Sequence, residues 1–331
     1  MLARRFKSFK PDDHIRSKHS ETGLPAPSPS ADEARRARLT AIGLMCAAVL
    51  CFALLDTNAK WLGLHGMDPL LVTFARYGVS VVLVSFLINP WSHPGVLRTK
   101  RPWLQLFRSL MLLGSTILNF IALRYLQLAE TISIMFAGPF LVALASGPLL
   151  GEWPGPRRLV ASGIGFLGVL VVTRPGSGGM HPAALLSVAG CFCYAFYVLS
   201  TRMLAAFDSS ETTMVYSGLA GTVILLPVLP FVWTTPQEPL SWLPLFAIGF
   251  FGAVGHWMLI VAHRLAPATV LAPFIYSQLA WMVLMGWLVF GQWPDRWTFI
   301  GGGIVIASGL YLLYRERVRH VPEEASSARL D

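Results

Sequence analysis

The sequence predicts an all-α integral membrane protein with ten transmembrane helices, arranged as two inverted five-helix repeats. Three observations support this prediction. Hydrophobic residues make up 54% of the 331 residues and charged residues only 13%, below the charged fraction of about 25% that is usual in soluble domains. The apolar residues form ten runs that are long enough to cross a bilayer. The chain also repeats itself along most of its length, which indicates two copies of one unit.

The repeat is clearest where residues 123–154 align without a gap with residues 263–294, at an offset of 140 residues. The aligned pairs include Arg124 and Arg264, Gly151 and Gly291, Trp153 and Trp293, and Pro154 and Pro294. The same offset joins Cys51-Phe52 to Cys191-Phe192. Because the match continues upstream and downstream of the best segment, the repeat unit covers a whole half of the apolar region.

Each copy contains five candidate spans. In the first copy they cover residues 40–62, 69–89, 103–125, 130–150 and 157–174, and in the second copy 181–203, 211–234, 242–263, 268–290 and 297–315. Residues 39–175 and 176–315 are therefore predicted to be the two five-helix repeats. The polar ends, residues 1–38 and 316–331, are predicted to be cytoplasmic tails, and the composition of the first predicts disorder.

The distribution of lysine and arginine predicts the orientation, because cytoplasmic loops of membrane proteins carry an excess of both. With the N-terminus inside, twenty of the 26 fall on the inner side, and only Lys60, Arg124, Arg174 and Arg296 fall on the outer side. Both termini are thus predicted to be cytoplasmic, in the inner cell membrane. The basic clusters lie beside apolar runs, so the net charge of +9 indicates membrane orientation rather than a nucleic-acid partner. An odd number of spans per copy inverts the second copy.

Charged side chains inside spans are costly and usually functional. Asp56 and Lys60 are four residues apart, so they share one face of the first span. At 1.5 Å per residue, Asp56 and Arg76 lie about 10 Å from the outer ends of their spans. An Asp56–Arg76 ion pair with Lys60 alongside would act as an outer gate, an anion contact or a proton-coupling group. The alternative is a structural pair that fastens the first two spans together.

A second set of polar and aromatic residues falls about halfway through its helices and predicts a ligand site near the midplane. The set consists of Tyr194, His256, Gln278, Trp281 and Phe136, with Asn119 nearer the outer side. Aromatic rings with a few polar tips suit a flat organic ligand, and His256 could also couple to protons. Core packing is the alternative for Tyr194 and Phe136, and an interhelical hydrogen bond for His256.

Other features are predicted to be structural. Arg108 would extend to the cytoplasmic surface, and Ser133 and Pro273 would break their helices. Residues 163–168 match the G-x-G-x-x-G dinucleotide fingerprint but lie in an apolar span. Their glycines, like those at 301–303, therefore predict a close-packing face at the periphery or at a dimer contact. The four cysteines have no metal-ligand spacing, so no metal or cofactor is predicted.

The paired segments ending in Gly151-Glu152 and Gly291-Gln292 resemble the EamA-type repeat of the drug/metabolite transporter superfamily. The opening helix CFALLDTNAKWL (51–62) and the Arg76-Tyr77 pair resemble it too, and the resemblance covers residues 40–315. It implies a secondary active transporter that moves a small organic metabolite by alternating access, such as an amino acid or derivative, a vitamin or a nucleoside-like compound. Import of a flavin- or adenosyl-type compound and export of an amino acid are both open.

Two departures separate the copies: Leu279 stands where the first copy has Pro139, and Gln292 where it has Glu152. The site is therefore not required to be symmetric. The rival classes are an intramembrane enzyme, which would need a convergent catalytic set, and a non-transporting receptor or scaffold. No catalytic residue is predicted. The expected partners are the small-molecule substrate, the lipid bilayer and a proton or another ion, with a monomer or weak homodimer as the assembly.

Overall fold

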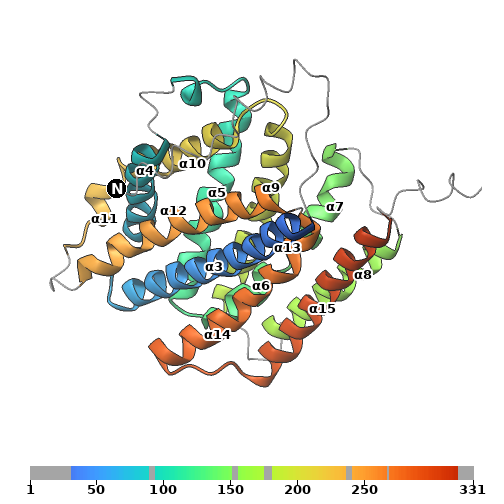
Figure 1. Ribbon diagram of the computed structural model, residues 1–331. Coiled ribbons are helices and arrows are strands. Elements are labelled where there is room, and N and C mark those ends of the chain that lie inside the picture. The colour runs from blue at the N-terminus through green and yellow to red at the C-terminus, as the bar shows by residue number, and fades with distance from the viewer. Residues whose placement is uncertain are drawn as a thin grey trace, which may run out of the picture.

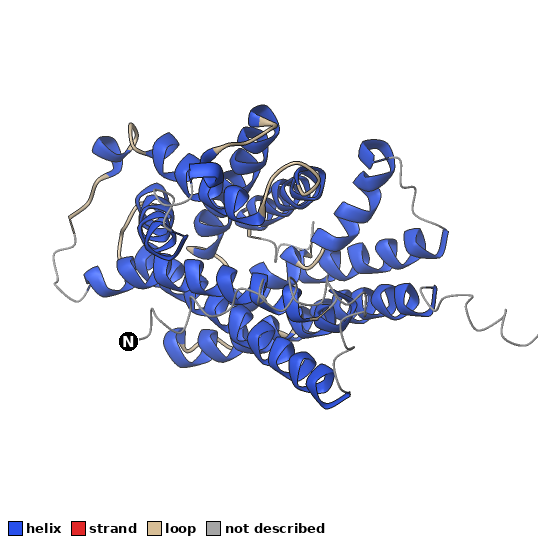
Figure 2. Ribbon diagram, turned by 45° about the horizontal axis from the view of Figure 1, so that its top comes forward, coloured by secondary structure: helices blue, strands red, loops and turns tan. Residues whose placement is uncertain are grey.

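The computed structural model describes residues 31–88, 94–150, 156–174, 181–235, 241–266 and 268–319. Within these ranges the regular elements are all helices, as Figure 2 shows. The first half contains α3 (Ala31–Leu64), α4 (Pro69–Ile88), the short 3₁₀ helix η1 (Pro94–Leu97), α5 (Pro102–Leu123), α6 (Leu128–Met135), α7 (Gly138–Leu150) and α8 (Pro156–Thr173). The second contains α9 (Ala183–Leu204), α10 (Ser210–Leu225), α11 (Leu229–Val232), α12 (Trp242–Leu265), α13 (Ala268–Ile275), α14 (Ser277–Phe290) and α15 (Arg296–Arg319).

Within the described residues, seven helical stretches are long and apolar enough to cross a membrane. They are Arg35–Leu64, Pro69–Phe86, Pro102–Leu123, Leu128–Leu149, Ala183–Leu204, Trp242–Leu265 and Pro273–Phe290. This confirms an all-α, multi-pass membrane protein. Helix also covers the other three predicted spans, but α10 and the apolar part of α8 are shorter and the C-terminal end of α15 is charged.

The ends of the chain differ from the predicted tails. Helix α3 begins at Ala31, so residues 31–38 are helical and do not belong to a disordered segment. At the other end α15 continues to Arg319, beyond the predicted start of the C-terminal tail at residue 316. The remainder of both predicted tails, residues 1–30 and 320–331, lies outside the described residues.

The helices of the two halves pack in reciprocal pairs. Helix α3 lies against α12 and its repeat equivalent α9 lies against α5, while α4 also contacts α12 and α10 also contacts α5. Equivalent helices meet in the pairs α4–α10 and α8–α15. Figure 1 shows α3 running beside α12 through the centre of the molecule and α8 beside α15 at its edge. Exchanging the two halves therefore keeps the main helix pairs, although some contacts, such as those of α6 with α14 and of α3 with α5, have no comparable counterpart in the other half.

The fourth helix of each half is broken at equivalent places, between α6 and α7 and between α13 and α14. In the first half Pro139 has no backbone N–H, so the carbonyl of Met135 loses its helical partner and accepts a hydrogen bond from the Cys191 Sγ at 3.6 Å. Both breaks follow a few residues after Ser133 and Pro273. Ser133 instead bonds the Ala129 carbonyl inside α6 at 2.7 Å.

Glycines allow α8 and α15 to approach each other closely. A Cβ added to Gly168 would lie 2.8 Å from the Gly301 carbonyl oxygen, and one added to Gly301 would lie 2.5 Å from the Gly168 carbonyl oxygen. Because backbone atoms cannot swing aside as side chains do, only glycine fits at these two positions. The glycines within residues 163–168 and 301–303 are thus confirmed as packing residues at Gly168 and Gly301.

Gly301→Ala is expected to separate α8 from α15 and to lower the stability of the folded protein by about 1–3 kcal/mol, the usual cost of overpacking. The matched control is Gly303→Ala on the same helix, because no atom lies within 4 Å of the Cβ that this change would add. Thermal unfolding in detergent measures both variants. Equal unfolding midpoints for the two would contradict the close glycine contact.

Candidate functional site

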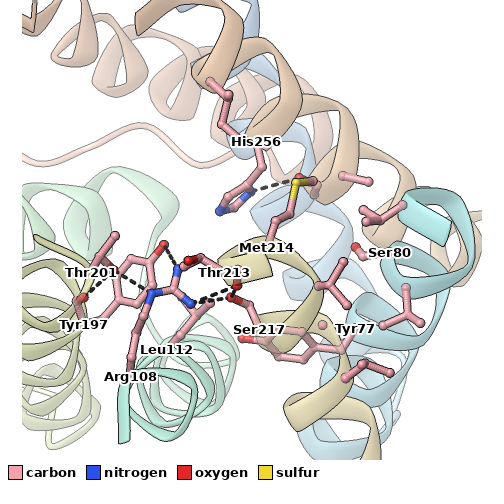
Figure 3. A pocket seen from close by; sticks show the side chains of 18 of the residues that line it. Tyr77, Ser80, Arg108, Leu112, Tyr197, Thr201, Thr213, Met214, Ser217 and His256 are labelled. Atoms are coloured by element: carbon pink, nitrogen blue, oxygen red, sulfur yellow. Dashed lines mark hydrogen bonds between the residues drawn. The ribbon is translucent and has the colours of Figure 1, made fainter. Parts of the chain in front are cut away.

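A cavity of about 640 Å³ lies between α4, α5, α9, α10 and α12, so both halves contribute to its lining. This volume is typical of sites for small organic ligands. Its walls are mainly apolar side chains, among them Val81 and Leu112, with a few polar groups between them. Figure 3 shows these polar groups converging on the open space from different helices.

Arg108 is the main polar group of the cavity. Its side chain is 4% exposed, and its guanidinium donates from Nε to Thr201 Oγ1 at 2.7 Å and from Nη1 to Ser217 Oγ at 2.6 Å. Nη1 also reaches the Thr213 carbonyl at 3.2 Å, and Nη2 reaches the Tyr197 hydroxyl at 3.2 Å. The guanidinium lies 4.7 Å from the centre of the Tyr197 ring. Arg108 is thus held firmly inside the cavity, and the prediction that it extends to the cytoplasmic surface is wrong.

The positive charge of Arg108 has no negative partner in the part of the chain that the structure describes. Among the described residues no carboxylate lies within ion-pair distance of its guanidinium, which bonds only hydroxyls and a carbonyl. A buried charge without a counter-ion is costly, and inside a membrane such a residue usually marks a ligand pathway. The cavity therefore favours a ligand that brings a negative charge or strong hydrogen-bond acceptors to Arg108.

His256 faces the same cavity from α12. One ring nitrogen, Nδ1, lies 2.9 Å from the Gly252 carbonyl oxygen, and because a carbonyl can only accept, this nitrogen carries the proton. In the neutral ring the other nitrogen, Nε2, is then an acceptor. The ring also packs edge-on against Phe52, with 5.0 Å between ring centres. Figure 3 shows His256 and Arg108 pointing into the space from opposite walls, so a ligand meets a donor on one wall and an acceptor on the other.

Asp208, in the turn between α9 and α10, lines the cavity at one end. Its carboxylate accepts hydrogen bonds from Thr99 Oγ1 at 2.5 Å, the Lys100 backbone N–H at 2.9 Å and Gln105 Nε2 at 3.0 Å. Burial by itself would raise the pKa of Asp208, but these hydrogen bonds outweigh it and hold the pKa below its ordinary value. Asp208 thereby ties the start of α5 to the turn that precedes α10.

Asp208→Asn is expected to lower stability at neutral pH, because the ionised carboxylate is the form that the three donors favour. A pKa that is lower in the folded state contributes stability above the unfolded value of about 3.9, and this contribution disappears as the pH falls through the folded value. The gap in unfolding temperature between wild type and variant should therefore be full at pH 7 and should narrow as the pH falls below the unfolded pKa and through the lower folded pKa of Asp208. A gap that does not change with pH would refute the electrostatic contribution.

The structure joins Asp56 and Arg76 indirectly. Within the described residues they form no direct ion pair. Asp56 accepts a hydrogen bond from Asn119 Nδ2 at 3.1 Å, and Arg76 donates to Thr116 Oγ1. Thr116 and Asn119 lie three residues apart on one face of α5, so α5 carries the connection between the two charges. Of the predicted gating residues, Arg76 also lines the cavity.

Lys60 lies apart from this network. It is 2% exposed, and its ammonium group donates to the Leu123 carbonyl at 3.1 Å and to the Leu126 carbonyl. Leu123 is the last residue of α5 and Leu126 lies in the turn that follows it, and the C-terminal end of a helix attracts a cation because of the helix dipole. The ring of Phe290 lies 5.5 Å from the ammonium group. These contacts make Lys60 a cap of α5, so it does not join Asp56 and Arg76.

Of the predicted midplane set, only His256 lines the cavity. Trp281 packs against two clusters of buried apolar side chains, and Phe136 is 5% exposed with its ring edge-on to Tyr276 at 5.0 Å. Tyr194 packs against Gly138, and Gln278 is half-buried in α14. These four residues lie outside the lining of the cavity.

The residues that sequence reasoning missed are Arg108 and its partners Tyr197, Thr201 and Ser217. One signal was available: in the second repeat the position of Arg108 is occupied by Ile248, which is fully buried. An arginine in one copy at a position that is apolar in the other indicates a specialised function. Its closeness to the end of the span favoured the surface interpretation instead.

Comparisons with known proteins give a consistent picture. The profile of the EamA-like transporter family matches residues 39–174 and 181–315. A riboflavin transporter of Vibrio cholerae serotype O1 is 29% identical over 271 residues, covering 81% of this chain and 91% of that protein. An S-adenosylmethionine uptake transporter of Rickettsia conorii is 26% identical over 293 residues, covering 86% and 96%. A solved crystal structure that is 18% identical superposes with a TM-score of 0.57, covering 87% of this chain and 99% of that one, which shows a shared fold.

Proposed function

Because this chain belongs to the EamA-like transporter family, we propose that it imports a small, flat organic metabolite of the flavin or adenosyl type by alternating access. Similar proteins that carry the names riboflavin transporter and S-adenosylmethionine uptake transporter support this proposal. The family and these names point to transport and not to catalysis. The observation that carries the proposal is the cavity between the two halves with the unpaired Arg108 in its wall.

The proposed architecture is ten transmembrane helices in two inverted five-helix repeats, with both termini in the cytoplasm of an inner-membrane protein. The reciprocal helix contacts of the two halves support it, as does the match of the family profile to each half. In this orientation most of the lining residues lie in the inner halves of their helices, while a few, among them Arg76 and Tyr77 of α4 and Gly252 of α12, lie just on the outer side of the midpoint. The cavity then opens to the cytoplasm. Substrate sites between inverted repeats are a common feature of secondary transporters.

A flavin is the first candidate substrate. Its uncharged ring system carries carbonyl groups that can accept from Arg108, and the hydroxyl groups of its flexible side chain can reach the opposite wall and donate to His256 Nε2. The Tyr197 ring, which already lies over Arg108, offers an aromatic surface for the flat ring. The donor and acceptor on opposite walls of the cavity therefore match this class of ligand.

S-adenosylmethionine is the second candidate, favoured by the relatives that carry that name. It combines a flat adenine ring with a carboxylate, which would meet Arg108, and with a positively charged sulfonium. The sulfonium has no evident partner, because Asp208 already accepts three hydrogen bonds at the end of the cavity. We therefore rank S-adenosylmethionine below a flavin as the candidate substrate.

Uptake of radiolabelled riboflavin and of radiolabelled S-adenosylmethionine by proteoliposomes tests the proposal. Time-dependent accumulation of one compound, reduced by an excess of the unlabelled form, is the expected result. Liposomes without protein are the control. If the folded, reconstituted protein accumulates neither compound, the proposed substrate class is wrong.

We further propose that Asp56 couples transport to protons or another cation, with Arg76 and Asn119 as its neighbours. Asp56→Asn keeps the size of the side chain, so we expect normal folding with uptake that no longer responds to an imposed pH gradient. Asn58→Ala, on the same helix, is the control, because the Asn58 side chain bonds only the Leu54 carbonyl of its own helix. If Asp56→Asn responds to the gradient as wild type does, this role is refuted.

A further inference from the structure

Two neighbouring hydrogen-bond donors in the cavity wall have no acceptor among the described residues. Arg108 Nη2 carries two N–H groups, and its described partner is the Tyr197 hydroxyl at 3.2 Å, so one N–H remains for a ligand. The Tyr197 hydroxyl accepts in that bond, and no described residue accepts its own proton. Both side chains line the cavity. The wall thus presents two adjacent donors, which we call the Arg108–Tyr197 donor pair.

The oxygen atoms beside the donor pair are already turned toward the guanidinium. Thr201 Oγ1 accepts from Arg108 and donates to the Tyr197 carbonyl at 2.7 Å. Ser217 Oγ also accepts from Arg108 and donates to the Thr213 carbonyl at 2.7 Å, and that carbonyl accepts from Arg108 as well. Because these hydroxyl protons are used within the protein, the donor pair is what this wall offers to a ligand.

The opposite wall has the opposite hydrogen-bonding character. His256 Nε2 is an acceptor there, because Nδ1 holds its proton against the Gly252 carbonyl at 2.9 Å. Figure 3 shows the Tyr197 hydroxyl and the neighbouring edge of the Arg108 guanidinium on the side that faces His256 across the open space. A ligand between the two walls therefore fits best with acceptors toward the donor pair and a donor toward His256.

We propose that the Arg108–Tyr197 donor pair selects the oxidised form of a flavin. The inference rests on the proposed function, in which the flexible side chain of the flavin reaches His256. In an oxidised flavin the nitrogen that carries this side chain lies across the central ring from an unsubstituted nitrogen, which is an acceptor. A carbonyl oxygen lies next to that acceptor. The edge that faces Arg108 and Tyr197 is therefore a pair of adjacent acceptors, which matches the pair of adjacent donors.

The reduced flavin does not match the donor pair. Its unsubstituted nitrogen has gained a hydrogen and become an N–H donor, so donors would face each other across the contact. Donors that are buried without an acceptor are costly, and such a mismatch is a common source of specificity between similar ligands. The protein distinguishes the two forms by binding and transfers no electron itself.

Tyr197 is the specificity-determining residue of the pair. The guanidinium covers one face of its ring, 4.7 Å from the ring centre, so the ligand meets the edge that carries the hydroxyl. The other repeat lacks both members: Ile248 stands at the position of Arg108, and Thr57 at that of Tyr197. Thr57 donates to the Ala53 carbonyl of its own helix at 2.7 Å. The donor pair is therefore a specialised feature and does not follow from the repeat.

Two flavin analogues test the inference on the wild-type protein in detergent, by competition with bound radiolabelled riboflavin. In 5-deazariboflavin a C–H group replaces the unsubstituted nitrogen of the central ring, whereas 1-deazariboflavin loses a nitrogen at the edge that carries the side chain. We expect 5-deazariboflavin to compete about tenfold more weakly than riboflavin, and 1-deazariboflavin to compete about equally well. If 5-deazariboflavin competes as well as riboflavin, or if 1-deazariboflavin is the weaker analogue, the inference is wrong.

Tyr197→Phe assigns the effect to the hydroxyl. Riboflavin should bind this variant several-fold more weakly, whereas 5-deazariboflavin should bind about as before, so the preference between them shrinks. A purely structural role of Tyr197 would weaken both ligands equally and would contradict the assignment. Tyr311→Phe, at an exposed tyrosine of α15, is the matched control and should keep the full preference.

The wild-type comparison needs no variant, so the inference can be judged even if Tyr197→Phe fails to fold. Failure of the proposed function gives a different result from failure of the inference. If riboflavin itself does not bind, the proposed flavin substrate is wrong and the inference is lost with it. If riboflavin and 5-deazariboflavin bind equally well, the substrate class stands and the inference alone is refuted.

Discussion

Replacing Arg108 by glutamine is expected to reduce uptake of the substrate by roughly ten- to a hundredfold. A hydrogen bond to a charged group contributes about 1.5–3 kcal/mol, and every 1.4 kcal/mol changes an equilibrium constant about tenfold. Arg76 also lines the cavity, but it comes from α4 and its guanidinium donates to Thr116 Oγ1, so it does not replace the donor from α5. The uptake assay in proteoliposomes measures the effect directly.

Stability should change little in Arg108→Gln. The substitution removes four hydrogen bonds from the guanidinium but also removes a buried charge that has no counter-ion among the described residues, and the two effects oppose each other. Arg108→Lys keeps the charge but lacks the planar fork of donors, so its uptake should fall as well. The control is Arg264→Gln, which changes an exposed arginine on α12 away from the cavity. Normal uptake by Arg108→Gln would show that this residue does not bind the substrate.

Replacing Lys60 by methionine is expected to have the largest effect on stability, a loss of about 3 kcal/mol. Methionine fills much of the same volume, but it leaves the Leu123 and Leu126 carbonyls without their donor, and each hydrogen bond to a charged group contributes about 1.5–3 kcal/mol. The loss applies to a buried helix end, which water cannot reach to restore the bonds. Chemical unfolding in detergent micelles measures the change.

Lys100→Met is the matched control, because Lys100 is exposed and the bond that it makes to Asp208 comes from its backbone N–H. Its unfolding midpoint should equal that of wild type. The comparison also distinguishes two roles for Lys60, a cap of α5 and a gating residue. A Lys60→Met protein with unchanged stability and lost uptake would assign Lys60 to the transport pathway instead.

The sequence by itself determined the class of the fold and much of its plan. Apolar runs near 20 residues long allow membrane helices and little else, so the all-helical membrane protein followed from composition and periodicity. The repeat likewise appears in the chain as a constant offset, and it anticipated equivalent breaks in the fourth helix of each half. The glycines at 168 and 301 were identified as packing residues, because an apolar span excludes a dinucleotide loop.

Only the tertiary structure decided which side chains share the cavity. Arg108 lies 89 residues before Tyr197 and 109 residues before Ser217 in the chain, and the depth of a residue within its span does not say which way its side chain points. Depth alone therefore grouped Trp281 and Phe136 with His256, although the helices direct the first two into the core. Depth also suggested a direct Asp56–Arg76 contact. In the structure the two residues are connected through hydrogen bonds to Asn119 and Thr116 of α5. Rotation of each helix about its axis is set by packing against its neighbours, and that information is absent from any single span.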